Sequence, residues 1–273
     1  MSKDLAKSLG GLQRVVFDEI HKYPRWKIIL KGLVDQKIPG LEIVVTGSSR
    51  LDLYQKKGDS LFWNRWRTRR RELLIQQDLR DLSGIRNLAL VESLYILLPT
   101  KIGTPLSVNK LHQAIDVAHD TVSEWLKYLE QLYILFRISP YAKKIHRALK
   151  KEQKAYLWDW SQVSDPVARF ENMVASHLLK AIHAWNDLGY GPFDLKYIRN
   201  KEKEEVDFLI LNDSKPWLLV EAKLSDSTPS SALVKFSSDL GVPAVQILRE
   251  PGICEQRAEL RIESASTFFL RWV

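Results

Sequence analysis

The chain has 273 residues, 45% hydrophobic and 27% charged, so it can bury a sizeable core as one large domain or two to three small ones. Its 41 Lys and Arg exceed its 33 Asp and Glu, and the net charge of +8 favours a polyanionic partner without demonstrating one. A single cysteine excludes a disulfide framework and a multi-cysteine zinc site, and no apolar run is long enough to span a bilayer, so we expect a soluble cytoplasmic protein with no membrane partner.

The first predicted elements are two short β-rich runs, "RVVFDEI" and "LEIVVTGSS". Between them, "RWKIILKGLVDQ" spaces its apolar residues as one face of a helix would. Strand, helix and strand at this spacing predict a βαβ unit with parallel strands. The first run carries two adjacent carboxylates, Asp18 and Glu19, as many ATPases do where they hold magnesium and ready a water.

A helical pattern follows from about residue 60 to residue 98 and includes the basic run "RWRTRRR". We favour a solvated helix face for this run over a phosphate-binding strip. After "KIGTP", the order helix, turn, helix, strand predicts a winged helix-turn-helix. One apolar stripe defines its second helix: Val122, Trp125, Leu126, Leu129 and Leu132.

The exposed face of that second helix is a poor surface for DNA, since it is mostly acidic or neutral, and we favour a scaffold that packs against another domain. The loop "YAKKIHRALKKEQK" is richer in basic residues: Lys143, Lys144, Arg147, Lys150, Lys151 and Lys154. It is either a phosphate-contacting segment or a solvated loop.

The last segment opens with the helix "RFENMVASHLLKAIHAW", followed by the strands "LKYIRN", "EVDFLIL" and "WLLVEAK". Its predicted buried stripe is Phe170, Val174, His177 or Leu178, and Ala181. The last two strands flank the turn "NDSKP" and predict an antiparallel hairpin. Strand periodicity places Val206, Phe208 and Ile210 on one face of the first strand, Asp207, Leu209 and Leu211 on the other, and Trp217, Leu219, Glu221 and Lys223 on one face of the second.

If Leu211 pairs with Trp217, Asp207 lies directly opposite Glu221. Two carboxylates opposed on a largely apolar face persist only with a cation or a proton between them, and a divalent metal is the natural cation. Lys223, on the same face, can then orient a water or a phosphate oxygen. The alternative for Glu221 and Lys223 is a cross-strand ion pair at a sheet end.

Glu171 stands near the start of the preceding helix and has two interpretations. It either reaches the hairpin as a third acid or is an N-terminal acid favoured by the helix dipole. The elements "FEN", "EVDFLI" and "LLVEAK" resemble the conserved elements of the restriction-endonuclease-like fold, the PD-(D/E)xK nucleases. The resemblance implies Glu171, Asp207 and Glu221 as Mg²⁺ ligands, with Lys223 as the catalytic group that orients water or stabilises phosphate.

The whole chain resembles a group of prokaryotic AAA-type ATPases in which a winged helix and a nuclease-like C-terminal domain follow the nucleotide-binding domain. The stretches "FDEIHKYPRW", "TGSSRLDL", "RDLSGIRNLALVE" and "TVSEWLKYLEQLYILFRISPY", together with the nuclease-like elements, carry this resemblance. It implies Asp18 and Glu19 as Walker B acids, and Thr46 and Ser48 at the sensor position of a nucleotide site.

Two departures weaken the nucleotide site. No Gly-x4-Gly-Lys-Ser/Thr loop precedes Asp18, and the long lid of the family is nearly absent between Leu61 and Arg67. We therefore expect a degenerate site without ATP hydrolysis, or residual ATP binding that another subunit completes.

The sequence thus predicts an α/β protein in four segments. Residues 1–60 form a truncated AAA-type βαβ remnant, 61–100 a helical connector, 101–160 a winged helix and 161–273 a restriction-endonuclease-like domain. The expected function is Mg²⁺-dependent nucleic-acid cleavage or nuclease-derived DNA binding. The alternative is a non-catalytic module for a protein partner or self-association.

Overall fold

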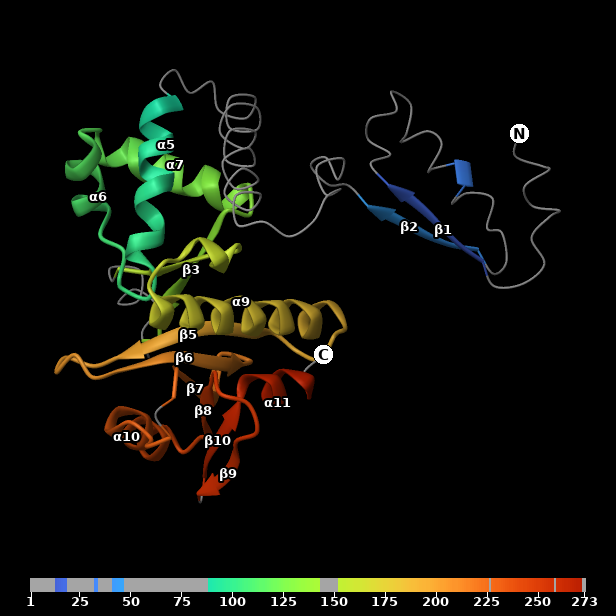
Figure 1. Ribbon diagram of the computed structural model, residues 1–273, viewed down its shortest axis with the longest axis vertical. Helices are drawn as coiled ribbons and strands as arrows, with labels where there is room; N and C mark the ends of the chain where they lie inside the picture. The colour runs from blue at the N-terminus through green and yellow to red at the C-terminus, as the bar shows by residue number, and fades with distance from the viewer. Residues whose placement is uncertain are drawn as a thin grey trace. The chain divides into compact units, whose positions relative to one another are not determined.

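The computed structural model describes residues 13–18, 32–33, 41–46, 88–142, 152–225, 227–257 and 259–271. The chain divides into two compact units, Met1–Arg69 and Arg70–Val273, and each is described by itself (Figure 1). Glu19, Ser48, the basic run at 65–71 and the basic loop residues at 143–151 lie outside the described residues.

The first unit contains a parallel pair of strands, β1 (Gln13–Asp18) and β2 (Leu41–Thr46). They pair in register from Gln13 opposite Leu41 to Asp18 opposite Thr46, which confirms the predicted parallel arrangement. Of the helix expected between them, residues 32 and 33 are described, and both are helical.

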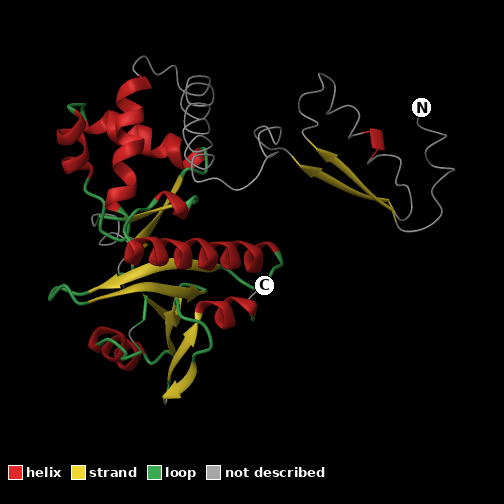
Figure 2. Ribbon diagram, viewed as in Figure 1, coloured by secondary structure: helices red, strands yellow, loops and turns green. Residues whose placement is uncertain are grey.

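The second unit is a mixed α/β structure with six described helices and an eight-stranded mixed sheet (Figure 2). The helices are α5 (Leu88–Leu97), α6 (Val108–Ile115), α7 (His119–Gln131), α9 (Pro166–Asp187), α10 (Ser231–Leu240) and α11 (Ala265–Leu270), with short 3₁₀ turns at Leu98–Lys101 and Trp160–Gln162. The strands are β3 (Leu135–Pro140), β4 (Lys154–Leu157), β5 (Phe193–Arg199), β6 (Glu205–Asn212), β7 (Lys215–Lys223), β8 (Ala244–Leu248), β9 (Cys254–Arg257) and β10 (Leu260–Ser264). Their order in the sheet is β4-β3-β5-β6-β7-β8-β10-β9.

Helices α5 to α7 followed by the antiparallel pair β3–β4 give the element order that a winged helix requires, and that assignment stays a prediction. Strand β3 also pairs in parallel with β5, through Ser139 and Pro140 against Lys196 and Tyr197. The β3–β4 hairpin and the C-terminal strands therefore belong to one sheet. One hydrophobic cluster accordingly runs from Val91 in α5, through the hairpin and α9, into the central strands.

Two helices cover opposite faces of the central strands. Helix α9 packs on β5 and β7 on one face, and α10 packs on β6 and β7 from the other (Figure 1). Most of the predicted stripes are buried, namely Val122, Trp125, Leu126 and Leu129 in α7, and Phe170, Val174, Leu178 and Ala181 in α9. Leu132, also predicted for the α7 stripe, is half-buried and follows the last residue of that helix. No helix among the described residues combines the length and the apolar composition that crossing a membrane requires.

The β6–β7 hairpin is antiparallel and has the predicted register over Phe208–Val220, Leu209–Leu219 and Ile210–Leu218. The pair from which that register was argued is wrong, because Leu211 pairs with Pro216 instead of Trp217. One extra β7 residue, Trp217, is thus accommodated as a bulge. A bulge redirects the side chain that it contains. The centre of the Trp217 ring accordingly lies 5.9 Å from that of Trp185 in α9, whereas the prediction placed Trp217 on the face of Leu219.

The side chain of Asn172 hydrogen-bonds to the backbone of Leu157 on the outer edge of β4, the first strand in the sheet order. Its amide donates to the carbonyl oxygen of Leu157 at 2.7 Å, and its Oδ1 accepts from the Leu157 N–H at 2.9 Å. Asn172 is fully buried, so no water can replace it at this edge. A side-chain amide therefore does here what a further strand would do.

We expect Asn172→Ala to lower the free energy of unfolding by about 2 kcal/mol, because it leaves the buried N–H of Leu157 without its partner and the C=O of Leu157 with only the Ser176 hydroxyl at 3.4 Å. Asn186 is the matched control, since its amide makes the same two bonds to the backbone of Phe193 at an exposed position. Water can satisfy those groups, so Asn186→Ala should cost about 1 kcal/mol or less. Urea unfolding of both variants measures the difference, and equal losses would contradict the role of burial.

Candidate functional site

The predicted acid on α9, Glu171, faces the sheet. Helix α9 begins at Pro166, and its N-cap is Asp165, whose carboxylate accepts from the Ala168 N–H at 2.7 Å. Glu171 is therefore in the second turn, and the first turn contains no acid. The interpretation of Glu171 as a dipole-stabilised N-terminal acid was wrong, because Asp165 takes that position.

The carboxylate of Glu171 is held by two side chains of β4. Its Oε1 accepts from the hydroxyl of Tyr156 at 2.7 Å and lies 3.2 Å from the Nζ of Lys154. A Cβ built at Gly103 would lie 2.8 Å from Oε2, so a larger residue cannot stand there without displacing the carboxylate. Burial raises the pKa of Glu171 to about 7, with a further increase from Asp207, while Lys154 and Tyr156 act to lower it.

Lys154 is the central residue of this cluster, and its side chain is only 1% exposed. Its Nζ lies 2.6 Å from Glu205 Oε1, 3.2 Å from Glu171 Oε1 and 3.8 Å from Asp207 Oδ1. Burial acts to lower the pKa of Lys154, but the surrounding carboxylates outweigh it and raise the pKa, so the ammonium stays charged. The assignment of Lys154 to the basic loop was wrong, because Lys154 lies in β4 with its side chain buried.

The sequence contained one signal for Lys154 that went unused. It directly precedes the apolar run "AYLWDW", and strand periodicity places it on the same face as Tyr156. Glu205 is the first residue of the predicted strand "EVDFLIL", two residues before Asp207 and so on the same predicted face, but the sequence analysis assigned it no role.

Asp207 reaches this cluster because β6 is irregular where Asp207 lies. Lys196 pairs with Leu209 but Ile198 pairs with Val206, so three residue steps of β6 oppose two of β5. This bulge changes the faces of the strand. Val206 packs with Leu209 in the cluster on the α10 side, contrary to the predicted alternation, and the carboxylate of Asp207 points toward Lys154.

The other oxygen of Asp207 connects it to β7. Oδ2 accepts from the Ala222 N–H at 3.0 Å. The described β6–β7 pairing ends at Phe208 and Val220, beyond which β7 continues beside β8. The Asp207 carboxylate therefore occupies the point where the two strands separate, next to Glu221.

Glu221 and Lys223 form the second part of the site. Glu221 is 5% exposed, its Oε2 accepts from the Ser230 hydroxyl at 2.6 Å, and its Oε1 lies 3.2 Å from Lys223 Nζ. Burial raises the pKa of Glu221, as does Asp207, while Ser230 and Lys223 act to lower it. The ion pair is real, but it lies within one strand and not across two.

The predicted acids are thus divided between two lysines. Glu171 and Asp207 lie around Lys154, whereas Glu221 is bound by Lys223 and Ser230. Within the described parts of the chain, no group of three or more Asp, Glu, His or Cys side chains is arranged to hold a metal ion. An ammonium group, that of Lys154, lies among Glu171, Glu205 and Asp207, whereas the cation expected between Asp207 and Glu221 stays a prediction.

At the first unit, the described backbone places Asp18 and Thr46 opposite each other at the carboxyl ends of two parallel strands. This is the edge at which ligands bind in open parallel sheets. Glu19 and Ser48 lie outside the described residues. Their assignment to a nucleotide site stays a prediction.

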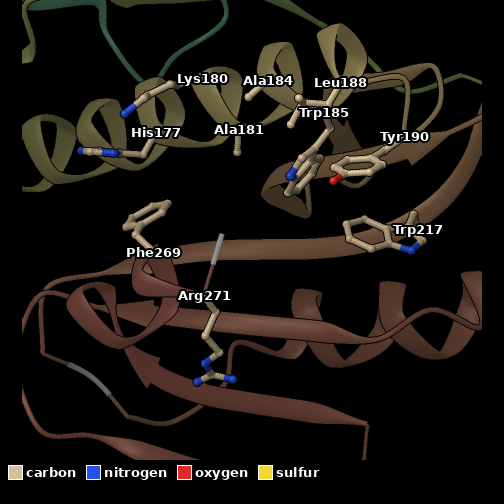
Figure 3. Close-up of a pocket in the computed structure, with 10 residues that line it drawn as sticks. All are labelled: His177, Lys180, Ala181, Ala184, Trp185, Leu188, Tyr190, Trp217, Phe269 and Arg271. Carbon is tan, nitrogen blue, oxygen red and sulfur yellow. The ribbon is translucent and has the colours of Figure 1, made fainter. Parts of the chain in front are cut away.

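A cavity of about 640 Å³ lies elsewhere, along the C-terminal half of α9. Figure 3 shows the rings of Trp185, Tyr190 and Trp217 on one side of it and His177 with Phe269 on the other. None of the four predicted catalytic residues lines this cavity.

The raised pKa of Glu171 predicts a pH dependence of stability. The unfolded chain releases this proton near pH 4.5 and the folded protein near pH 7, so the folded state binds more protons between these values. The free energy of unfolding therefore falls as pH rises through this window. Glu171→Gln removes the titration, so the stability of the variant minus that of the wild type should rise across the window by on the order of 3 kcal/mol.

Denaturant unfolding at several pH values measures this difference. Glu259→Gln, at an exposed position, is the control and should show a difference that does not change with pH. A flat difference for Glu171→Gln as well would contradict the buried, proton-holding carboxyl.

Comparisons with known proteins give three family matches, of which the first two overlap at residues 52–69. Residues 2–69 match the family model of an AAA domain, residues 52–164 match a domain of unknown function, DUF8612, and residues 168–264 match a second domain of unknown function, DUF4143. No curated protein and no solved structure matches the chain. The family matches support an AAA-type ATPase-like protein.

Proposed function

We propose that the second unit is a nuclease-derived domain that binds nucleic-acid phosphate and hydrolyses phosphodiesters with Mg²⁺ at Asp207, Glu221 and Lys223. The supporting observation is the strand separation at Val220, where the Asp207 carboxylate bonds to the amide of the residue after Glu221. Lys223 lies on the same strand, and its side chain is 39% exposed and so accessible to a ligand.

The donor atoms suit Mg²⁺, which takes oxygen ligands and is commonly held by one or two carboxylates together with water and substrate phosphate. Asp207 and Glu221 would supply the carboxylates, and their mutual repulsion favours a cation between them. When bound, Mg²⁺ polarises a phosphoryl oxygen and lowers the pKa of a coordinated water.

The protein's own groups would position these parts. The Ala222 amide fixes Asp207, and Ser230, the N-cap of α10, fixes Glu221. The Lys223 ammonium would move away from Glu221 Oε1 to contact a phosphate oxygen. The new charge-assisted bond to phosphate would offset the loss of the ion pair with Glu221. The net charge of +8 favours the approach of a polyanion.

The second candidate is a non-catalytic module that binds nucleic acid or a protein partner without cleavage. The buried Lys154 ammonium supports it, since this group neutralises acids that a three-acid metal site would need. For the first unit we propose a degenerate nucleotide site that does not hydrolyse ATP.

Incubation with plasmid, single-stranded and branched DNA in Mg²⁺ or Mn²⁺ tests the nuclease. We expect metal-dependent cutting that Glu221→Gln reduces at least about 100-fold, because the variant loses the charge that holds the cation. Glu255→Gln, on the exposed strand β9, is the control and should cut normally. DNA binding without any cutting by the wild type would rule out the nuclease and favour the second candidate.

An ATP hydrolysis assay tests the first unit separately. The wild-type chain should release phosphate from ATP no faster than its Asp18→Ala variant, since residues 1–69 contain no Gly-x4-Gly-Lys-Ser/Thr phosphate loop. Hydrolysis that Asp18→Ala abolishes would overturn this proposal.

A further inference from the structure

Lys154 is a buried charge surrounded by three carboxylates from two other elements. Glu171 comes from α9, and Glu205 and Asp207 come from β6, all within 3.8 Å of one Nζ. Arg199 provides a second, more distant cation, with its Nη1 3.6 Å from Glu205 Oε2. The acids thus already have an internal counter-ion.

The position of this ammonium is fixed from several sides. Asn172 holds the same strand, β4, by two hydrogen bonds to the backbone of Leu157. The Nζ of Lys154 lies 5.6 Å from the centre of the Tyr197 ring. Tyr156, two residues on, donates to the same oxygen of Glu171 that Lys154 contacts. Lys154 therefore cannot swing into solvent as a surface lysine does.

We propose that Lys154 takes the place of a divalent cation among Glu171, Glu205 and Asp207, and thereby excludes Glu171 from any metal site of the wild-type protein. A metal ion and an ammonium group cannot share this position, because two cations a few ångströms apart in a buried site repel strongly. The three-acid Mg²⁺ set expected from the sequence therefore does not fit this chain.

The metal ligands that remain are Asp207 through its oxygen next to β7, and Glu221. That assignment rests on the proposed function. The exclusion of Glu171 by Lys154 does not, since it follows from the ion pairs of β4.

Calorimetric titration with Mn²⁺ alone, without nucleic acid, tests the inference on the full chain. Glu171→Gln should bind Mn²⁺ as the wild type does. Lys154→Met removes the charge at similar length and should gain Mn²⁺ affinity of at least about tenfold, with a matching rise of the melting temperature on metal addition. Lys154→Arg keeps the charge and should gain none.

Two further variants keep the test decisive. Lys154→Met combined with Glu171→Gln should lose the gain, while Lys154→Met combined with Glu221→Gln should retain it. If the single variant Lys154→Met does not fold, the double variant Lys154→Met with Glu205→Gln replaces it. This double variant keeps the net charge of the wild type and should still bind Mn²⁺ more tightly than the wild type.

The outcomes separate this inference from the proposed function. It is overturned if Lys154→Met, or its charge-preserving form, binds Mn²⁺ no better than the wild type. It is also overturned if Glu171→Gln weakens Mn²⁺ binding in the wild-type background. A wild type that binds no Mn²⁺, beside a Lys154→Met variant that does, would sink the proposed nuclease while supporting the role of Lys154.

Discussion

The buried ammonium of Lys154 is the interaction on which the second unit depends. It joins β4 to α9 and β6, although β3 and β5 separate β4 from β6 in the sheet order. A carboxylate removed from water is costly unless a partner compensates it, and here one cation compensates several. Removal of that cation would leave Glu171, Glu205 and Asp207 repelling one another in a poorly hydrated space.

The same strand explains why the middle and C-terminal segments share a core. Strand β4 follows helices α5 to α7 in the chain, yet its edge is closed by Asn172 of α9, and its Lys154 supplies the charge that the C-terminal acids require. The sheet is continuous through the β3–β5 pairing. Substitutions at the candidate site should therefore also change the stability of helices α5 to α7, because β4 connects the site to these helices through buried bonds.

Two strand irregularities decide which side chains meet. The bulge in β6 directs Asp207 toward Lys154, and the bulge at Trp217 in β7 directs that ring toward α9. Bulges add one residue to a strand, and since side chains alternate with period two, every residue beyond a bulge exchanges faces relative to the simple alternation. The site geometry follows from these two departures as much as from the regular sheet.

The sequence by itself determined the element types and much of their pairing. Apolar periodicity located the α7 and α9 stripes, and β-rich runs located the parallel β1–β2 pair and the core register of the β6–β7 hairpin. These features depend on local residue order, which a single sequence contains. The acids Glu171, Asp207 and Glu221 were also singled out from the sequence, and their role as metal ligands stays a prediction.

Only the tertiary structure decided what lies between those acids. Lys154 is 17 residues from Glu171 and more than 50 from Asp207, and no local pattern links it to either. It was assigned to a basic loop because charge composition dominates when a long-range contact is invisible. The identity of a counter-ion depends on which distant strand the fold brings to a buried carboxylate, and that choice is made by packing of the whole unit.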